Sequence, residues 1–263
     1  MHQPLYAETY IKDETSSWLV FLHGFGGSSK MWKKQLDSFR EHYNLLLLDL
    51  PGHGKSRTGI SELGARTFAD VADLVVYTME VHGVEQAGFV CCSLGTLVFA
   101  AIQDKYPQVV TSAILCGAIA GVSRKLQAML ALLDRTKELF PHMFVLNSFA
   151  RLLLPLKEHE TARNFFIESG KLLDRMEFLA WFSLVVREQN RLKNLHVSMK
   201  HVLFISGTED FTFLRGVKKT FGAMSDANLA LLKHCGHVCN LLLPKEFNAL
   251  SLSFLNQTIP ALV

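Results

Sequence analysis

The sequence predicts an α/β protein with a mostly parallel central sheet flanked by helices. Two observations predict this fold class: short runs that are apolar on both faces, and helical patterns that separate these runs. A strand that is covered on both sides of a parallel sheet has no polar face, so its sequence does not alternate. A third observation, a long stretch with helical patterns only, predicts an all-helical insert between two strands.

Six apolar runs have the length of a strand. They are WLVFL (18–22), NLLLLD (44–49), GFVCC (88–92), SAILC (112–116), HVLFIS (201–206) and NLALL (228–232). An earlier pair of strands is expected within 5–12, where apolar and polar residues roughly alternate. Right-handed crossovers through the intervening helices would make these strands parallel.

The intervening segments carry apolar residues at helical spacing. Ser29 is placed to cap a helix whose apolar stripe begins at Trp32, and Thr67 to cap another that Gly83 ends. From about 121 to 196, four helical patterns follow one another with no strand run between them. We therefore expect a core domain of residues 1–120 and 197–263, with a helical insert over 121–196.

Composition and charge exclude several classes of protein. The chain has 263 residues, of which 49% are hydrophobic and 19% charged, so it can bury a large core and is not disordered. Its net charge is +3 and its basic residues are spread along the chain, which argues against nucleic-acid binding. No apolar stretch is long enough to span a membrane, and no secretion signal is apparent. We expect a cytoplasmic protein whose five cysteines are reduced.

The stretch GFVCCSLGTLVFAAIQ, residues 88–103, places Ser93 between a strand and a helix. Such a tight turn strains the backbone and needs small residues two positions before and after, which here are Cys91 and Gly95. The turn lifts the hydroxyl above the carboxyl edge of the sheet, where open α/β folds bind ligands. Ser93 is therefore predicted to be a nucleophile.

A serine nucleophile needs a base, and the base needs an orienting acid. His237 follows the strand run 228–232, and Asp210 follows the run 201–206, so both would lie at the same edge as Ser93. Glu209 is the alternative acid and His234 the alternative base. The spacing from the preceding glycines favours Asp210 and His237.

The oxyanion that forms on attack needs two preorganised N–H donors. One would be the backbone of Leu94, directly after the nucleophile. The other would come from the glycine-rich loop in LVFLHGFGGSSKMW, where the backbone of Phe25 is best placed. Nearby His23 and His53 are expected to hydrogen-bond their own turns rather than to catalyse.

The motifs HGFGGS (23–28), DLPGHGKS (49–56), CCSLG (91–95), GTED (207–210) and CGHVCNLLLPKEF (235–247) occur in this order. Together they resemble the α/β-hydrolase superfamily, in particular cap-bearing serine hydrolases such as small esterases and C–C bond hydrolases. The resemblance implies that residues 121–196 form a cap over the active site. The chain departs from the family pattern at Cys91, where a glycine is usual, at Leu242, where a glutamate is frequent, and after Asp210, where a proline is often seen.

Two other motifs suggest sites that we do not expect. His234, Cys235, His237 and Cys239 resemble a metal cluster, but a domain of this size needs no structural metal, and we expect neither metal nor cofactor. The Gly-Lys-Ser that ends DLPGHGKS lacks the earlier glycine of a phosphate-binding loop, which argues against a nucleotide site.

All five cysteines are expected near the active-site edge of the sheet. Their presence has a simple explanation, because cysteine packs well as a small buried side chain. We nevertheless expect reagents that modify thiols to inhibit the protein by crowding the pocket.

The predicted function is a serine hydrolase that cleaves a small-to-medium, largely apolar carboxylic ester, with this small molecule as its partner. The aromatic and aliphatic side chains of residues 121–196 are the clue to an apolar pocket. Two alternatives stay open: a C–C bond hydrolase or lyase of the same fold, and a ligand receptor or signalling protein that retains the triad.

Overall fold

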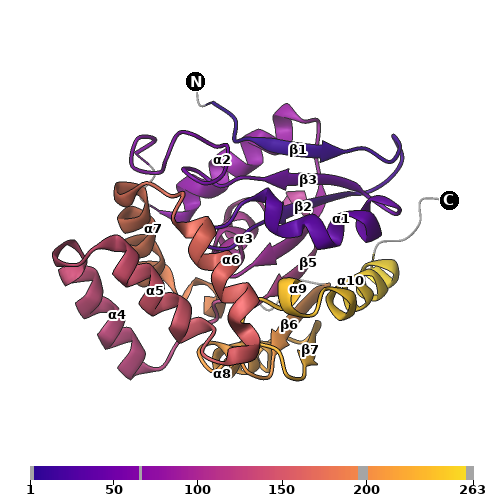
Figure 1. The fold of residues 1–263 in the computed structure, drawn as a ribbon. Coiled ribbons are helices and arrows are strands. Elements are labelled where there is room, and N and C mark those ends of the chain that lie inside the picture. The colour runs from indigo at the N-terminus through magenta and orange to yellow at the C-terminus, as the bar shows by residue number, and fades with distance from the viewer. Residues whose placement is uncertain (1–2, 65–66, 195–200, 259–263) are drawn as a thin grey trace.

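A seven-stranded sheet forms the centre of the molecule (Figure 1). The computed structural model describes residues 3–64, 67–194 and 201–258. The strands in this part of the chain are β1 (Ala7–Tyr10), β2 (Trp18–Leu22), β3 (Asn44–Leu48), β4 (Ala87–Cys92), β5 (Val110–Cys116), β6 (Val202–Gly207) and β7 (Ala227–Leu232). Their order is β1-β3-β2-β4-β5-β6-β7; β1 is antiparallel to β3 and the other neighbours are parallel. The predicted fold class is confirmed.

The burial of the strands explains their sequences. Every residue of β3, β4 and β6 is buried, whereas β1 and β7, at the two edges, are partly exposed. The pair of strands expected within 5–12 is wrong, because this segment forms only β1. The chain leaves the sheet where Asn44 Oδ1 accepts the N–H groups of Lys12 and Asp13 at 2.7 and 3.3 Å.

Helices cover both faces of the sheet. One face carries α1 (Lys33–Arg40), α9 (Cys239–Leu242) and α10 (Pro244–Thr258), and the other carries α2 (Phe68–Val81) and α3 (Leu94–Lys105) (Figure 1). Helix α8 (Leu214–Phe221) packs beside β6 and β7, and short 3-10 turns lie at η1 (Ser29–Trp32) and η2 (Pro107–Val109).

The two predicted helix caps have different outcomes. Thr67 caps α2 as predicted: its side chain accepts the N–H of Asp70, and the Asp70 carboxylate accepts the N–H of Thr67. The assignment of Ser29 as a cap is wrong, because Ser29 lies inside η1 and its N–H donates to the buried carboxylate of Asp49 at 2.6 Å. Helix α1 begins only at Lys33.

The segment between β5 and β6 is helical, as expected. It contains α4 (Arg124–Thr136), η3 (Lys137–Leu139), α5 (His142–Leu153), η4 (Lys157–His159), α6 (Glu160–Gly170), α7 (Arg175–Glu188) and η5 (Arg191–Asn194). Figure 1 shows α4–α7 grouped beside the sheet rather than within its covering layers. The predicted end of this insert at residue 196 lies outside the described residues. Across the described ranges, no helix is both long and apolar enough to cross a bilayer.

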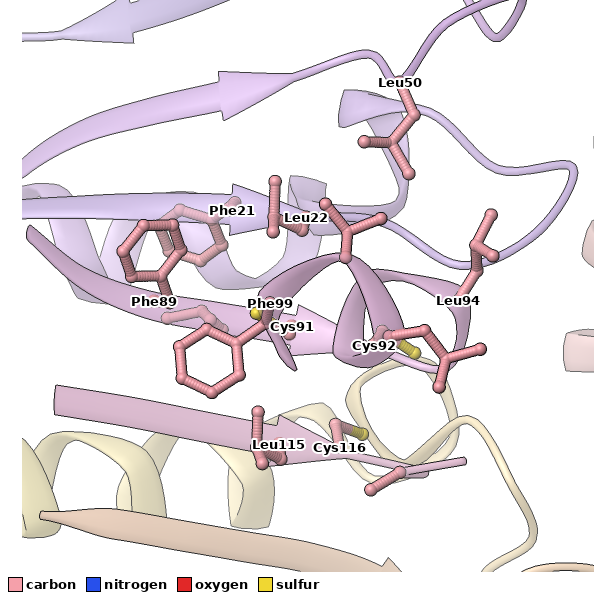
Figure 2. Packing of buried hydrophobic residues seen from close by; sticks show 14 of the residues in the cluster. Phe21, Leu22, Leu50, Phe89, Cys91, Cys92, Leu94, Phe99, Leu115 and Cys116 are labelled. Atoms are coloured by element: carbon pink, nitrogen blue, oxygen red, sulfur yellow. The ribbon is translucent and has the colours of Figure 1, made fainter. Parts of the chain in front are cut away.

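Buried side chains fill the region where β2, β4 and β5 end. Figure 2 shows side chains of these strands packed against α3, with Cys92 and Cys116 close to the ends of β4 and β5. Cys92 and Cys116 are register partners, and both are buried. The loops that follow these strands therefore leave from a rigid platform.

Candidate active site

Ser93 lies in a strained turn between β4 and α3. Its φ of 49° and ψ of −112° place a residue with a side chain in a region that normally favours glycine. The Ser93 N–H donates to Cys116 O at 3.0 Å, which ties the turn to β5. A Cβ on Gly95 would lie 2.3 Å from Leu22 O, so glycine is required at this position. Cys91, two positions before Ser93, is fully buried.

The structure brings Ser93, His237 and Asp210 into one hydrogen-bonded chain. His237 Nε2 lies 2.9 Å from Ser93 Oγ, and His237 Nδ1 lies 2.8 Å from Asp210 Oδ2. Because a carboxylate only accepts hydrogen bonds, Nδ1 carries the hydrogen and Nε2 is free to accept the proton of Ser93. The arrangement can therefore activate the hydroxyl.

Burial and packing hold the acid and the base in place. The side chains of His237 and Asp210 are each 1% exposed. Asp210 Oδ1 accepts the N–H of Phe213 at 3.0 Å, and the Phe213 ring packs against the His237 ring with centroids 5.1 Å apart. A Cβ on Gly117 would lie 2.3 Å from His237 O, so the loop after β5 also packs closely against the histidine.

The alternative acid and base lie elsewhere. Glu209 Oε2 is 3.0 Å from His159 Nε2, so this carboxylate points to the helical segment and not to His237. The side chain of His234 is 92% exposed. Of the two pairs considered from the sequence, the structure places Asp210 and His237 beside Ser93.

The glycine-rich loop after β2 lies against the nucleophile. A Cβ on Gly24 would be 3.4 Å from Ser93 Cβ. The Gly24 carbonyl accepts hydrogen bonds from His23 Nδ1 at 2.7 Å and from the Gly27 N–H at 2.9 Å. In a trans peptide the N–H points away from the carbonyl, so fixing Gly24 O also fixes the direction of the Phe25 N–H.

The two N–H groups predicted for the oxyanion are available. Within the described part of the chain, neither Phe25 N nor Leu94 N donates a hydrogen bond to another residue. Leu94 is the first residue of α3, where N–H groups have no partner within the helix. These donors can meet a negatively charged oxygen.

His23 and His53 support the loop as neutral side chains. His23 Nε2 accepts the Leu50 N–H at 2.9 Å, and His53 Nε2 accepts the Gly26 N–H at 3.0 Å. Burial lowers the pKa of His23 to about 4 and that of His53 to about 3. Both rings therefore stay uncharged at neutral pH, and both hydrogen-bond turns as predicted.

An apolar cavity opens at Ser93 and His237. Its other lining residues are Gly24, Phe25, Gly27, Met31, Cys92, Ala162, Phe165, Phe166, Ser169, Val238 and Leu241. None of these described residues is Lys, Arg, Asp or Glu, so the cavity suits an uncharged group.

Sequence reasoning missed which residues of the helical segment face the cavity. Ala162, Phe165, Phe166 and Ser169 do so, all from α6. Their spacing of three, one and three places them on one helical face, which is the signal that could have identified them.

The residues of the suspected metal cluster do not form a site. Among the residues with described positions, no group of three or more His, Cys, Asp or Glu side chains could hold a metal ion. Cys235 Sγ and Cys239 Sγ both lie 3.6 Å from Gly236 O, while His237 faces Asp210 and Ser93.

Known proteins resemble this chain in sequence and in structure. It is 37% identical over 101 residues to the dihydrolipoyllysine-residue acetyltransferase component of an acetoin cleaving system from Cupriavidus necator, covering 38% of this chain and 26% of that protein. It is 39% identical over 89 residues to 2-succinyl-6-hydroxy-2,4-cyclohexadiene-1-carboxylate synthase from Escherichia coli, covering 33% of each. The matches thus span a third or less of the length of these two curated relatives.

Two solved structures share the fold over nearly the whole chain. MGS-M2, an alpha/beta hydrolase enzyme from a Medee basin deep-sea metagenome library, matches with a TM-score of 0.77 and 23% identity, covering 98% of this chain and 97% of that one. A thermophilic esterase from Thermogutta terrifontis matches with a TM-score of 0.78 and 17% identity, covering 97% and 94%. A family model for the alpha/beta hydrolase fold matches residues 17–156, more than half of the chain, and the protein therefore belongs to the alpha/beta hydrolase family.

Proposed function

We propose that the protein is a serine hydrolase that cleaves a small-to-medium, largely apolar carboxylic ester. The observation that carries the proposal is the hydrogen-bonded chain Asp210–His237–Ser93, which ends at an apolar cavity. A strained serine turn, a buried acid–base pair and two unused N–H donors are the parts that acyl transfer requires.

In the proposed reaction, Ser93 Oγ attacks the ester carbonyl while His237 Nε2 takes the hydroxyl proton. Asp210 keeps His237 in the reactive tautomer and stabilises its positive charge. The N–H groups of Phe25 and Leu94 donate to the oxyanion. His237 then gives its proton to the departing alcohol, which leaves Ser93 acylated. Water attacks the acyl-enzyme with His237 again as base, and the acid is released.

We take residues 121–196 as a cap domain on a core of residues 1–120 and 197–263. Helix α6 supports this division because four of its residues line the cavity at Ser93. The apolar lining supports an acyl group without charge, and we propose that no metal or other cofactor takes part. Five free cysteines are compatible with a reducing, cytoplasmic setting.

A C–C bond hydrolase or lyase is the second candidate, favoured by the match to the carboxylate synthase from Escherichia coli. A substrate with carboxylates needs cationic or hydrogen-bonding partners in its pocket. The described lining offers Ser169 and backbone groups but no Lys or Arg. We therefore place the ester first.

The proposal is tested by fluorophosphonate labelling with intact-mass detection, beside turnover of p-nitrophenyl esters of increasing acyl length. We expect one label on the wild type, none on Ser93→Ala, and a chain-length optimum that reflects the cavity. Labelling with negligible turnover would favour the C–C hydrolase, or a ligand receptor that retains the triad. Absence of labelling on the wild type would contradict an activated serine.

A further inference from the structure

Helix α6 spans the candidate site from one side to the other. At its N-terminal end, His159 of η4 reaches the loops that carry Asp210 and His237. At its C-terminal end, Gly170 is so close to the glycine-rich loop that a Cβ on Gly26 would lie 3.0 Å from Gly170 Cα. The cavity-lining face of α6 lies between these two contacts. The loops that carry the proposed acid, base and oxyanion donor thus contact α6 or the turn directly before it.

The contact at His159 is buried and specific. Its side chain is 1% exposed, and its Nε2 lies 3.0 Å from Glu209 Oε2. Because a carboxylate accepts, His159 Nε2 carries the hydrogen of this bond. A Cβ on Gly236 would lie 2.7 Å from His159 Cε1, so the ring rests directly on the backbone of Gly236. Only a glycine leaves room for the ring at that position.

The two groups that His159 touches are the chain neighbours of the proposed acid and base. Glu209 precedes Asp210, and Gly236 precedes His237. The two loops are also joined to each other, because the Glu209 N–H donates to Cys235 O at 2.9 Å. A displacement of His159 would therefore shift both loops relative to Ser93.

We propose that His159 is a positioning residue through which α6, seated over the site, aligns Asp210 and His237 with Ser93. This inference rests on the proposed function, since the alignment affects a rate only if these three residues catalyse. It assigns to the helical segment a part in aligning the catalytic groups as well as in lining the cavity.

The chain offers matched variants for a test. His159→Leu puts an apolar side chain of comparable size in place of the ring and removes the N–H donor, and His159→Gln restores a donor. His234→Ala is the control, because His234 is the second histidine beside Glu209, 3.6 Å from Oε1, but its side chain is 92% exposed. Melting temperatures establish that each variant is folded.

We expect His159→Leu to lower kcat on the best ester by about tenfold to a hundredfold, with KM within about twofold. His159→Gln should recover most of kcat, and His234→Ala should match the wild type. If His159 had a purely structural role, His159→Leu would lower the melting temperature but would not lower kcat at a nearly constant KM. Wild-type kcat in folded His159→Leu would overturn the proposal.

Glu209 provides a second route if His159→Leu does not fold. Glu209→Gln keeps an oxygen that accepts from His159, whereas Glu209→Ala does not. We expect Glu209→Ala to lower kcat as much as His159→Leu does, and Glu209→Gln to retain kcat. The double variant of Glu209→Ala and His159→Leu should lose no more kcat than either single variant. Equal losses in Glu209→Gln and Glu209→Ala would contradict a role for the hydrogen bond.

A measurement without substrate separates this proposal from the proposed function. The His237 Nδ1–H that faces Asp210 should give a downfield proton resonance, assigned by its loss in Asp210→Ala. We expect the resonance to shift or broaden in His159→Leu and to be retained in His159→Gln and His234→Ala. An unchanged resonance in His159→Leu would overturn the positioning role, even if the wild type cleaved no ester at all.

Discussion

In the proposed mechanism, Asp210 acts through His237, whose tautomer it fixes and whose positive charge it stabilises. The Asp210 carboxylate is 1% exposed and lies 2.8 Å from His237 Nδ1. Because a carboxylate accepts, this contact places the ring hydrogen on Nδ1. In Asp210→Asn, the amide can donate to Nδ1 and thereby leave the hydrogen on Nε2, where it faces Ser93.

We expect Asp210→Asn to fold normally and to lose about 10⁴-fold in kcat. Steady-state turnover of the best p-nitrophenyl ester measures the loss, and a melting curve reports the fold. Asp37→Asn, at a side chain that is 85% exposed, is the matched control and should be neutral. Near-wild-type turnover in Asp210→Asn would remove Asp210 from the mechanism.

His53 makes stability depend on pH. Burial lowers its pKa to about 3 in the folded state, whereas an unfolded histidine titrates near 6.5. Below about pH 6.5 the unfolded chain binds a proton that the folded protein does not, so stability is full above this pH and falls as the pH drops toward 3. The loss amounts to about 1.4 kcal/mol per pH unit for one proton.

We therefore expect His53→Gln to show a shallower loss of unfolding free energy than the wild type between about pH 6 and 4.5. Urea denaturation at several pH values gives the two slopes. His234→Gln controls for the removal of a histidine at an exposed position. Parallel slopes for wild type and His53→Gln would show that His53 is protonated in the folded state over this range.

At the scale of elements, a buried carboxylate of α7 forms hydrogen bonds with the loop at residues 60–61. Glu177 is 4% exposed and accepts hydrogen bonds from Ile60 N at 2.6 Å and from Ser61 Oγ at 2.9 Å. A Cβ on Gly59 would lie 2.1 Å from Glu177 Oε2. Trp181, one turn further along α7, donates from Nε1 to Pro51 O at 3.1 Å.

Glu177→Ala should destabilise the protein by about 2–4 kcal/mol, because it leaves a buried backbone donor and a hydroxyl without an acceptor. Glu168→Ala, which removes an exposed ion pair with Lys171, should cost about 0.5 kcal/mol or less. Chemical denaturation of the wild type and both variants measures these losses of unfolding free energy. Equal stabilities of the two would show that the contact with residues 60–61 contributes nothing.

At the scale of the whole molecule, the five cysteines lie inside the core. Cys91, Cys92, Cys116, Cys235 and Cys239 are free and buried. Burial raises the pKa of the Cys91 thiol, which disfavours the reactive thiolate. All five thiols are buried, so the expected inhibition by thiol reagents requires the core to open or, for Cys92, entry through the cavity that it lines.

We expect the native protein to alkylate far more slowly than the urea-unfolded chain, which should take up five labels. Activity should fall in step with labelling, because Cys92 directly precedes Ser93. Intact mass and residual activity, followed in parallel, measure both. Rapid native labelling, or full activity after labelling of all five thiols, would contradict this expectation.

Local sequence predicted the parts of the molecule that depend on periodicity and on strand ends. Six apolar runs became strands, and residues at three strand ends met around Ser93. Contacts between the helical segment and the core were not predicted, because Glu177 and Ile60 are 117 residues apart and His159 and Glu209 are 50 apart. Periodicity identifies a helix over 160–170, but not which of its faces meets the cavity.

The cavity-facing residues of α6 all fall within the short segment 162–169. A single synthetic DNA cassette covering these codons can therefore vary the described α6 contribution to the pocket wall while leaving the sheet and its loops as they are. Libraries restricted to Ala162, Phe165, Phe166 and Ser169 are small enough to screen exhaustively. Directed evolution of substrate range in this protein can begin from that one stretch.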